Sequence, residues 1–230
     1  MKRSEINRIL ADAKAFFLRQ NFHLPKWAYW SPEQWAQAGH EADEVRNCGL
    51  GWDLTDFGSG DFDKQGLVLF TLRNGLPSGS GPEAKDYCEK AMIIGEQQLT
   101  PMHFHWQKME DIINRAGGRL VLELYNANRN TEELDPHSKV NVSIDGVEQT
   151  FCPGEKVVLD PGQSITLPHY MYHTFYAEPH SGRVLAGEVS RVNDDARDNR
   201  FLQELPRFPA LQEDEPAIHL LCTEYPPAEG

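Results

Sequence analysis

The segment from Pro101 to Glu110 concentrates side chains that can bind a metal ion. His103 and His105 are two residues apart, so on a β-strand both imidazoles point to the same face. Glu110 follows shortly after, and His173 comes from a separate, later apolar segment. Three neutral imidazoles and one carboxylate suit a borderline divalent ion such as Mn, Fe, Co, Ni or Zn. The sequence therefore predicts a metal site built from these four side chains, with open coordination positions for substrate or water.

The elements that must position these residues change character along the chain. Residues 4–22 repeat apolar side chains at helical spacing, with Ser4 as the expected N-cap, and a second helix is expected to begin at Ser31. From about residue 52 the pattern changes to short strands and turns, and Asp145-Gly146 predicts a type I′ hairpin. Strands are expected at 67–72, 87–94, 101–105, 119–125, 139–144, 147–151, 164–167, 173–178 and 183–190, with an edge strand at 218–222. This pattern predicts a mainly β protein, a sandwich or a barrel.

Composition excludes several classes of function. The net charge of −13, with acidic residues spread along the chain, argues against binding nucleic acid or anionic membranes, because both require a clustered basic face. The four cysteines are far apart and form no CxxC pair, which indicates a reduced, cytoplasmic compartment. Charged residues interrupt every apolar stretch near the N-terminus, so we expect no signal peptide and no membrane span.

The ligand residues resemble the first motif of the cupin superfamily, which reads roughly G-x5-HxH-x3,4-E-x6-G. His103, His105, Glu110 and Gly117 fit its intervals, whereas Gly95 lies two residues too far upstream for the first glycine. The resemblance implies an antiparallel jelly-roll barrel. We therefore expect a single domain over 1–230, with a helical N-terminal extension (1–50), a cupin β-barrel (51–192) and a C-terminal extension packed on the barrel (193–230).

The second cupin motif, roughly G-x5-PxG-x2-H-x3-N, is matched less completely. Gly162, Pro168 and His173 fit it, while Tyr170 replaces the glycine and Ala177 replaces the asparagine. These replacements are expected to alter turn geometry more than metal binding. The spacing favours His173 over the neighbouring His169 as the fourth ligand.

The whole chain is also similar to the D-lyxose isomerase family of sugar-isomerising cupins. The segments 103–114 and 188–195 carry this closer resemblance. It implies a manganese-preferring enzyme, a homodimer, that interconverts D-lyxose with D-xylulose and D-mannose with D-fructose. The alternatives are an iron-dependent cupin dioxygenase and a sugar-binding cupin without enzymatic activity.

Two of the ligand assignments have less specific alternatives. His103 and His105 can be read as buried core histidines, but burying both without partners is costly and a carboxylate lies nearby. Glu110 can be read as a solvated loop acid, although its interval matches the motif.

Two lysines accompany the predicted ligands. Lys108 shares a face with Glu110 if the chain is extended there, and both are out of step with His105, so a turn or bulge must lie between. A kink that aims Glu110 at a metal aims Lys108 inward too, where its ammonium can bind a sugar oxygen or stabilise an enediolate. Lys90 occurs within an apolar strand, which suggests either substrate binding or protection of a sheet edge. A surface position in a loop is the alternative for Lys108.

Isomerisation through a cis-enediol needs a carboxylate that moves a proton between C1 and C2. Glu110, as a metal ligand, is poorly placed for this role. Glu204, which lies among apolar residues in 201–206, is the first candidate, and Glu188 is the second. A surface acid is the alternative for Glu204, and a hydride shift is the alternative mechanism. Asp194, Asp195 and Asn199 are candidates for orienting sugar hydroxyls, or they form a polar loop.

Overall fold

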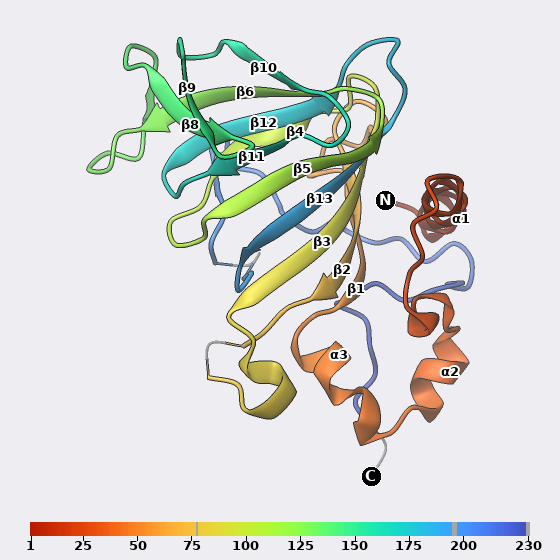
Figure 1. The fold of residues 1–230 in the computed structure, drawn as a ribbon. Helices are drawn as coiled ribbons and strands as arrows, with labels where there is room; N and C mark the ends of the chain where they lie inside the picture. The colour runs from red at the N-terminus through yellow and green to blue at the C-terminus, as the bar shows by residue number, and fades with distance from the viewer. Residues whose placement is uncertain (77, 195–196, 229–230) are drawn as a thin grey trace.

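Two antiparallel sheets face each other and form the body of the molecule (Figure 1). The computed structural model describes residues 1–76, 78–194 and 197–228. The larger sheet has eight strands in the order β1-β2-β3-β13-β5-β11-β8-β9, and the smaller sheet has the order β10-β6-β12-β4-β14, with β7 paired to β6. This mainly β architecture of curled antiparallel sheets confirms the predicted fold class.

The strands of the larger sheet are β1 (Gly51–Thr55), β2 (Leu67–Arg73), β3 (Tyr87–Ile94), β13 (Val184–Arg191), β5 (Glu110–Gly117), β11 (Ser164–Leu167), β8 (Val140–Ile144) and β9 (Val147–Phe151). Those of the smaller sheet are β10 (Lys156–Leu159), β6 (Leu120–Ala127), β7 (Leu134–Asp135), β12 (Met171–Ala177), β4 (Thr100–Phe104) and β14 (Arg200–Phe201). All these strands pair antiparallel. The helices are α1 (Arg3–Arg19), α2 (Pro32–Gln37) and α3 (Asp43–Asn47).

Apolar side chains from both sheets fill the space between them. Strand residues point alternately to the two faces of a sheet, so Met92 and Ile94 of β3 enter this core together with Leu122 of β6 and Phe175 of β12. The main hydrophobic core therefore lies inside the barrel, between the larger and the smaller sheet.

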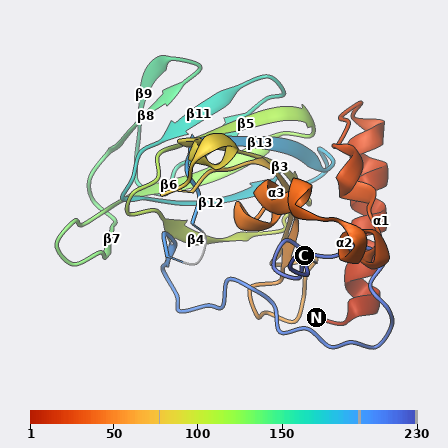
Figure 2. The same ribbon diagram turned by 90° about the horizontal axis from the view of Figure 1, so that it is seen from below.

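Helix α1 covers the outer face of the larger sheet at β1 to β3 and β13 (Figures 1 and 2). Its buried stripe includes Ile6, Leu10 and Phe17, which share a second core with Trp52 and Phe70. This end of the larger sheet is consequently buried on both faces, which explains why all five residues of β1 are buried.

The C-terminal segment runs back over the outside of the molecule to α1 (Figure 2). Arg3, whose side chain is only 2% exposed, binds both Glu213 and Glu224 from this segment. Asn7 of α1 donates to Glu215 at 2.7 Å. The segment is therefore attached to the helix as well as to the barrel.

Four local predictions have different outcomes in the structure. Ser31 forms the predicted capping box at the start of α2. Asp145 and Gly146 both have positive φ (51° and 81°), as a type I′ turn requires. The prediction for Ser4 is wrong, because α1 begins one residue earlier and the Ser4 hydroxyl donates to Asp214 at 2.7 Å. The expected strand at 218–222 is also absent from the described residues.

The boundaries of the three expected segments remain a prediction, although α3 ends at Asn47, β1 begins at Gly51 and β13 ends at Arg191. No helix in the described residues is long and apolar enough to cross a lipid bilayer.

Candidate active site

Three histidines meet inside the barrel on the smaller sheet. His103 of β4 and His173 of β12 stand directly opposite each other in the antiparallel register, and His105 follows β4 immediately. One ring nitrogen of each lies within 4.8 Å of the corresponding nitrogens of the other two. All three side chains are buried. The period of two that places His103 and His105 on one face thus delivers both to the side that holds His173.

Backbone carbonyls fix the tautomer of every histidine in this cluster. The Nδ1 atom of His103 lies 2.8 Å from the carbonyl of Pro101, and that of His173 lies 3.0 Å from the carbonyl of Met171. The Nδ1 atom of His105 lies 2.6 Å from the carbonyl of Asp198. Because a carbonyl only accepts, each Nδ1 carries the proton and each Nε2 has a free lone pair.

Glu110 approaches the cluster from the opposite sheet, at the first position of β5. Its Oε1 lies 3.2 Å from Nε2 of His173 and 3.5 Å from Nε2 of His105. The contact with His173 has no hydrogen-bond geometry, and Nε2 of His173 is buried without a hydrogen-bond partner in the described part of the chain. A buried lone pair of this kind needs a partner. Converging imidazole nitrogens and a carboxylate oxygen fit a divalent metal ion.

Burial and neighbouring charge together set the ionisation of two of the predicted ligands. Burial, together with the neighbouring His173 and His105, lowers the pKa of His103 well below its usual value, so the ring is neutral near pH 7. Burial alone would raise the pKa of Glu110, but neighbouring positive charge, chiefly the Lys108 ammonium group, outweighs it and holds that pKa well below its usual value. Glu110 is therefore an ionised carboxylate.

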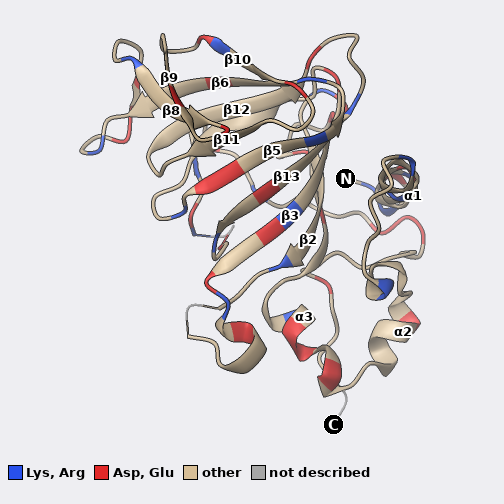
Figure 3. Cartoon of the chain, viewed as in Figure 1, with Lys and Arg blue, Asp and Glu red and all other residues tan. Residues whose placement is uncertain are grey.

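Neighbouring strands of the larger sheet place a second acid beside Glu110. Acidic residues are present on both of these strands, β5 and β13 (Figure 3). Ser190 of β13 pairs with Glu110, and Glu188, two residues earlier, points to the same inner face and pairs with Lys90 of β3. Glu188 and Lys90 are 5% and 3% exposed. Strand β3 lies between β2 and β13, so the alternative that Lys90 protects a sheet edge is wrong.

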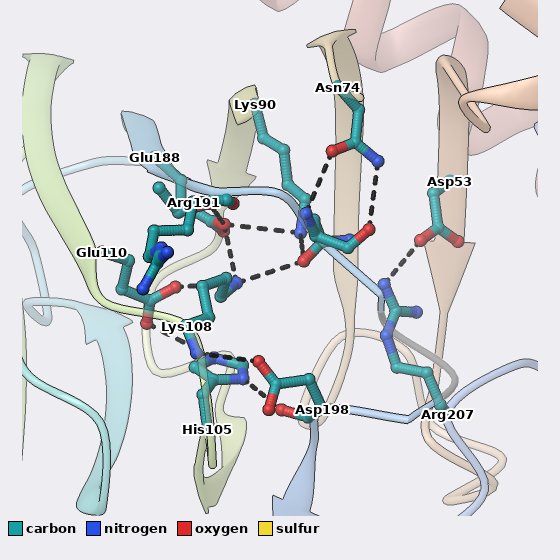
Figure 4. A network of polar contacts seen from close by, with 12 residues as sticks. Asp53, Asn74, Lys90, His105, Lys108, Glu110, Glu188, Arg191, Asp198 and Arg207 are labelled. Atoms are coloured by element: carbon teal, nitrogen blue, oxygen red, sulfur yellow. Dashed lines mark hydrogen bonds and ion pairs between the residues drawn. The ribbon is translucent and has the colours of Figure 1, made fainter. Parts of the chain in front are cut away.

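Lys108 joins the two acids (Figure 4). Its Nζ lies 2.9 Å from Oε2 of Glu110 and 2.8 Å from Oε1 of Glu188. The Nζ of Lys90 lies 3.5 Å from the same oxygen of Glu188, and both ammonium groups donate to Oδ1 of Asn193, at 2.8 and 3.2 Å. The expected turn between His105 and Glu110 exists, and it aims Lys108 inward as the spacing predicted.

The two lysines also keep Glu188 ionised. Burial alone would raise the pKa of Glu188, but Lys108 and Lys90 outweigh it and the net shift is downward. Two ammonium groups thus balance two carboxylates among buried side chains, where electrostatic interactions are strong. Glu188 is buried and ionised but, unlike Glu110, it makes no hydrogen bond or ion pair with the histidines in the described part of the chain.

A cavity connects the histidine cluster with this charged network. Its charged and polar wall includes the four predicted ligands, Lys90, Lys108, Glu188, Asn199 and Arg207, and its apolar wall includes Phe57, Leu67, Leu69, Ile112, Phe175 and Phe201. A small polar molecule in this cavity would therefore contact a metal-binding end and an acid–base end at once. Such an arrangement can polarise a carbonyl at one atom and transfer a proton at the next.

Glu204 does not belong to this cavity. Its side chain is exposed and it is absent from the residues that line the site. The expectation that the apolar residues around it bury it is wrong, because Leu202 is itself 43% exposed and the segment after β14 runs along the surface. The second candidate, Glu188, is the acid that the sheet delivers to the site. His169 lines a different surface pocket, and Asp195 lies outside the described residues.

Several residues of the site gave no usable signal in the sequence. Asn193 binds both lysines, Asp198 binds His105, and Arg207 pairs with Asp53 at 2.5 Å beside the cavity. All three lie beyond β13, in a segment whose one strand among the described residues is the short β14, paired with β4. Neither periodicity nor a motif interval fixes such a position.

Tyr170 shows how the chain tolerates the loss of the motif glycine. Its φ is +62°, so it retains the left-handed conformation that glycine adopts readily. A bulky residue pays about 1–2 kcal/mol for this conformation. Stacking on Phe104, with ring centroids 5.1 Å apart, and a 2.9 Å hydrogen bond from its N–H to the carbonyl of His105 offset that cost. The turn that precedes His173 is therefore preserved.

Comparison with known proteins gives one consistent result. The sequence model described as D-lyxose isomerase matches residues 1–225. The chain is 51% identical over 226 residues to the D-lyxose/D-mannose isomerases of Escherichia coli O157:H7 and of Serratia proteamaculans, covering 98% of both sequences in each case. Among solved structures, the L-ribose isomerase of Geodermatophilus obscurus superposes with a TM-score of 0.60 at 17% identity, covering 92% of this chain and 98% of that one. The last similarity shows the shared fold.

Proposed function

The chain belongs to the D-lyxose isomerase family and is an aldose–ketose isomerase, and on that premise we propose that a divalent metal is its cofactor and D-lyxose and D-mannose are its substrates. The products would be D-xylulose and D-fructose. The observation that carries the proposal is the position of Glu188. This ionised acid shares one buried cavity with the histidine cluster but stands apart from it, on the far side of Lys108.

His103, His105, Glu110 and His173 would hold the ion, whose charge would polarise a carbonyl oxygen and stabilise negative charge on the sugar oxygens O1 and O2. Manganese is the proposed metal, and Zn, Co, Fe and Ni suit the same donors. The remaining chemistry belongs to the side chains around the cavity.

Glu188 is proposed as the catalytic base. Its carboxylate removes the proton from C2 of the aldose, which leaves a cis-enediolate, and the resulting carboxylic acid, whose proton exchanges with solvent, delivers a proton to C1. Glu188 is ionised, as the first step requires, and the ammonium groups of Lys90 and Lys108 beside it limit the orientation of its carboxylate. Both transfers use one face of the sugar, so a single acid suffices.

Lys108 and Lys90 are proposed to act on the oxygens. When the C2 proton leaves, negative charge develops on O1 and O2, and a preorganised ammonium group stabilises that charge more than the neutral sugar. Isomerisation also moves one proton from O2 to O1. Nζ of Lys108, between the two carboxylates, is placed to donate a proton to one oxygen and to recover it from the other.

The test is to strip the protein of metal, restore Mn, Fe, Co, Ni and Zn one at a time, and assay a panel of pentoses and hexoses for ketose formation. We expect ketose from D-lyxose and D-mannose, with Mn giving the highest rate, and no activity in the stripped protein. Absence of ketose from every aldose with every metal would refute the proposal. Equal rates under argon and air are expected, whereas oxygen uptake with iron would support the dioxygenase alternative.

We further propose that the enzyme is a cytoplasmic homodimer. The spacing of its four cysteines supports the cytoplasmic location, and the homodimer is what the resemblance to the D-lyxose isomerase family implies. Light scattering on the protein as it elutes from a size-exclusion column tests the oligomeric state. A mass of about twice the 26.1 kDa of one chain is expected, and a monomer mass would contradict the homodimer.

A further inference from the structure

Asp198 is connected to three residues of the turn that separates the metal ligands. Its two carboxylate oxygens accept the backbone N–H groups of Gln107 and Lys108, both at 2.9 Å. Its own backbone carbonyl accepts Nδ1–H of His105 at 2.6 Å (Figure 4). The residue is only 9% exposed. A single residue from the far end of the chain thus holds both the side chain of one ligand and the backbone that follows it.

The two ends of the turn are held by hydrogen bonds from the N–H of Tyr170 to the carbonyl of His105 and from the N–H of Arg191 to the carbonyl of Met109, whereas the backbone N–H groups at its centre are bound by Asp198. The turn carries the chain from β4 in the smaller sheet to β5 in the larger one, and residues 105–109 have no helical or strand structure. Buried backbone N–H groups must find acceptors, and here the carboxylate of Asp198 supplies them at two consecutive residues. The conformation that points Lys108 into the cavity therefore depends on an acceptor supplied from outside the turn.

We propose that Asp198 is a positioning residue for the isomerisation, which fixes the 105–109 turn so that Nζ of Lys108 reaches Glu110 and Glu188 and the ring of His105 faces the other histidines. This inference rests on the proposed function of the site. Asp198 contacts neither the cavity's acids nor the sugar-binding space through the bonds given above, and it acts through Lys108 and His105.

Both oxygens of the carboxylate are needed, which gives a sharp variant. In Asp198→Asn one oxygen becomes an NH2 group that faces a backbone N–H, so one hydrogen bond is lost and two donors oppose each other. The side chain keeps its size, so the packing around it is preserved. Lys108 then loses its fixed backbone, and the carbonyl that orients His105 shifts with the segment.

The chain offers a matched control at Asp135. Its carboxylate also accepts backbone N–H groups from two consecutive residues, His137 and Ser138, at 2.8 and 3.2 Å. It lies in β7, outside the residues that line the cavity. Asp135→Asn therefore shows how much the loss of such a carboxylate costs in general, without any effect that is specific to catalysis.

The experiment measures kcat and KM for D-lyxose with Mn, and the affinity of the stripped proteins for Mn2+ alone by calorimetry, at a temperature where circular dichroism shows each variant folded. For Asp198→Asn we expect kcat to fall about 10–100-fold with KM changed less than about threefold, and Mn2+ affinity to fall about 10-fold, in the range found for groups that orient metal ligands. Asp135→Asn should match the wild type in all three.

A double-mutant cycle separates positioning from folding. In a Lys108→Met background, Asp198→Asn should lower kcat by no more than about threefold, because the group through which it acts is gone. The proposal would be overturned if the losses of kcat from Lys108→Met and Asp198→Asn were fully additive. It would also be overturned if Asp198→Asn were less stable but kept the kcat and Mn2+ affinity of the wild type. If Asp198→Asn does not fold, Asp198→Glu, which keeps both acceptor oxygens at a longer reach, is judged by the same criteria. A wild type that isomerises no aldose would refute the proposed function instead, and the Mn2+ affinities would still decide the role of Asp198.

Discussion

Replacing Glu188 by Gln tests the assignment of the catalytic base. The change keeps the size of the side chain and removes its ability to take the C2 proton. The four proposed metal ligands are untouched, and Lys108 retains its 2.9 Å ion pair with Glu110. We therefore expect a folded protein that binds Mn and sugar but turns over slowly.

General base catalysis contributes about 10²–10⁴-fold, so kcat should fall by that factor, equivalent to about 3–5 kcal/mol in the activation barrier. Folding stability should fall too, because two buried ammonium groups then share a single carboxylate; removing one partner of a buried ion pair costs about 3–5 kcal/mol when nothing replaces it. Lys90 and Lys108 keep their hydrogen bonds to Asn193, which reduces that cost.

The assay follows ketose formation from D-lyxose with saturating Mn, at a temperature well below the measured Tm of the variant. Glu204→Gln is the matched control, because it makes the same chemical change on an exposed side chain and should keep kcat within about twofold. A Glu188→Gln enzyme with wild-type kcat, or a Glu204→Gln enzyme that has lost turnover while remaining folded, would refute the reasoning.

Three further predictions concern the rest of the site and the fold. Lys108→Met should lower kcat about 10²–10³-fold with little change in Mn content, whereas Lys64→Met, at an 85% exposed lysine, should have no effect; equal behaviour of the two variants would count against an oxyanion role. His103→Ala should leave less than about a tenth of the wild-type Mn content by elemental analysis, and retention of stoichiometric metal would show that the ion is held elsewhere. Burial lowers the pKa of His219 in the folded protein, so below the unfolded pKa of about 6.5 the unfolded chain binds a proton at this residue more readily than the folded chain does. The free energy of unfolding is therefore unaffected by this group above that pH and decreases as pH falls below it. Urea unfolding at pH 7.5 and 5.5 should therefore show a smaller loss of stability in His219→Gln than in the wild type, and identical losses would contradict the assignment.

The sequence predicts three strands with both bounds correct, and the alternating residues of 164–167 and the Asp145-Gly146 turn before 147–151 are the clearest local signals for them. The expected strands at 87–94, 147–151 and 164–167 match β3, β9 and β11 in both bounds. Strand β5 was not predicted, because its inward positions are occupied by Glu110 and Asn114 as well as Ile112, so functional and polar residues interrupt the pattern.

The residues of the site likewise divide into those that local sequence signals place and those that only the folded structure places. His103, His105 and Lys108 were placed by strand periodicity and by the length of the turn, both local properties of the sequence. The choice between Glu188 and Glu204 depended on which one the sheet buries, and that is decided by the pairing of β13 with β3 and β5. Asp198 could not be recognised at all, because its role arises only when the segment after β13 returns to the turn that follows β4.

The most direct test of the central claim, proton transfer by Glu188 in a metal-dependent isomerase, is to convert D-lyxose with the Mn-loaded protein in D2O and to examine the product by NMR. The mechanism predicts D-xylulose that carries solvent deuterium at C1, because the acid form of Glu188 exchanges before it returns its proton. Ketose without any deuterium at C1 would contradict proton transfer by this residue, and no ketose at all would contradict the proposed activity.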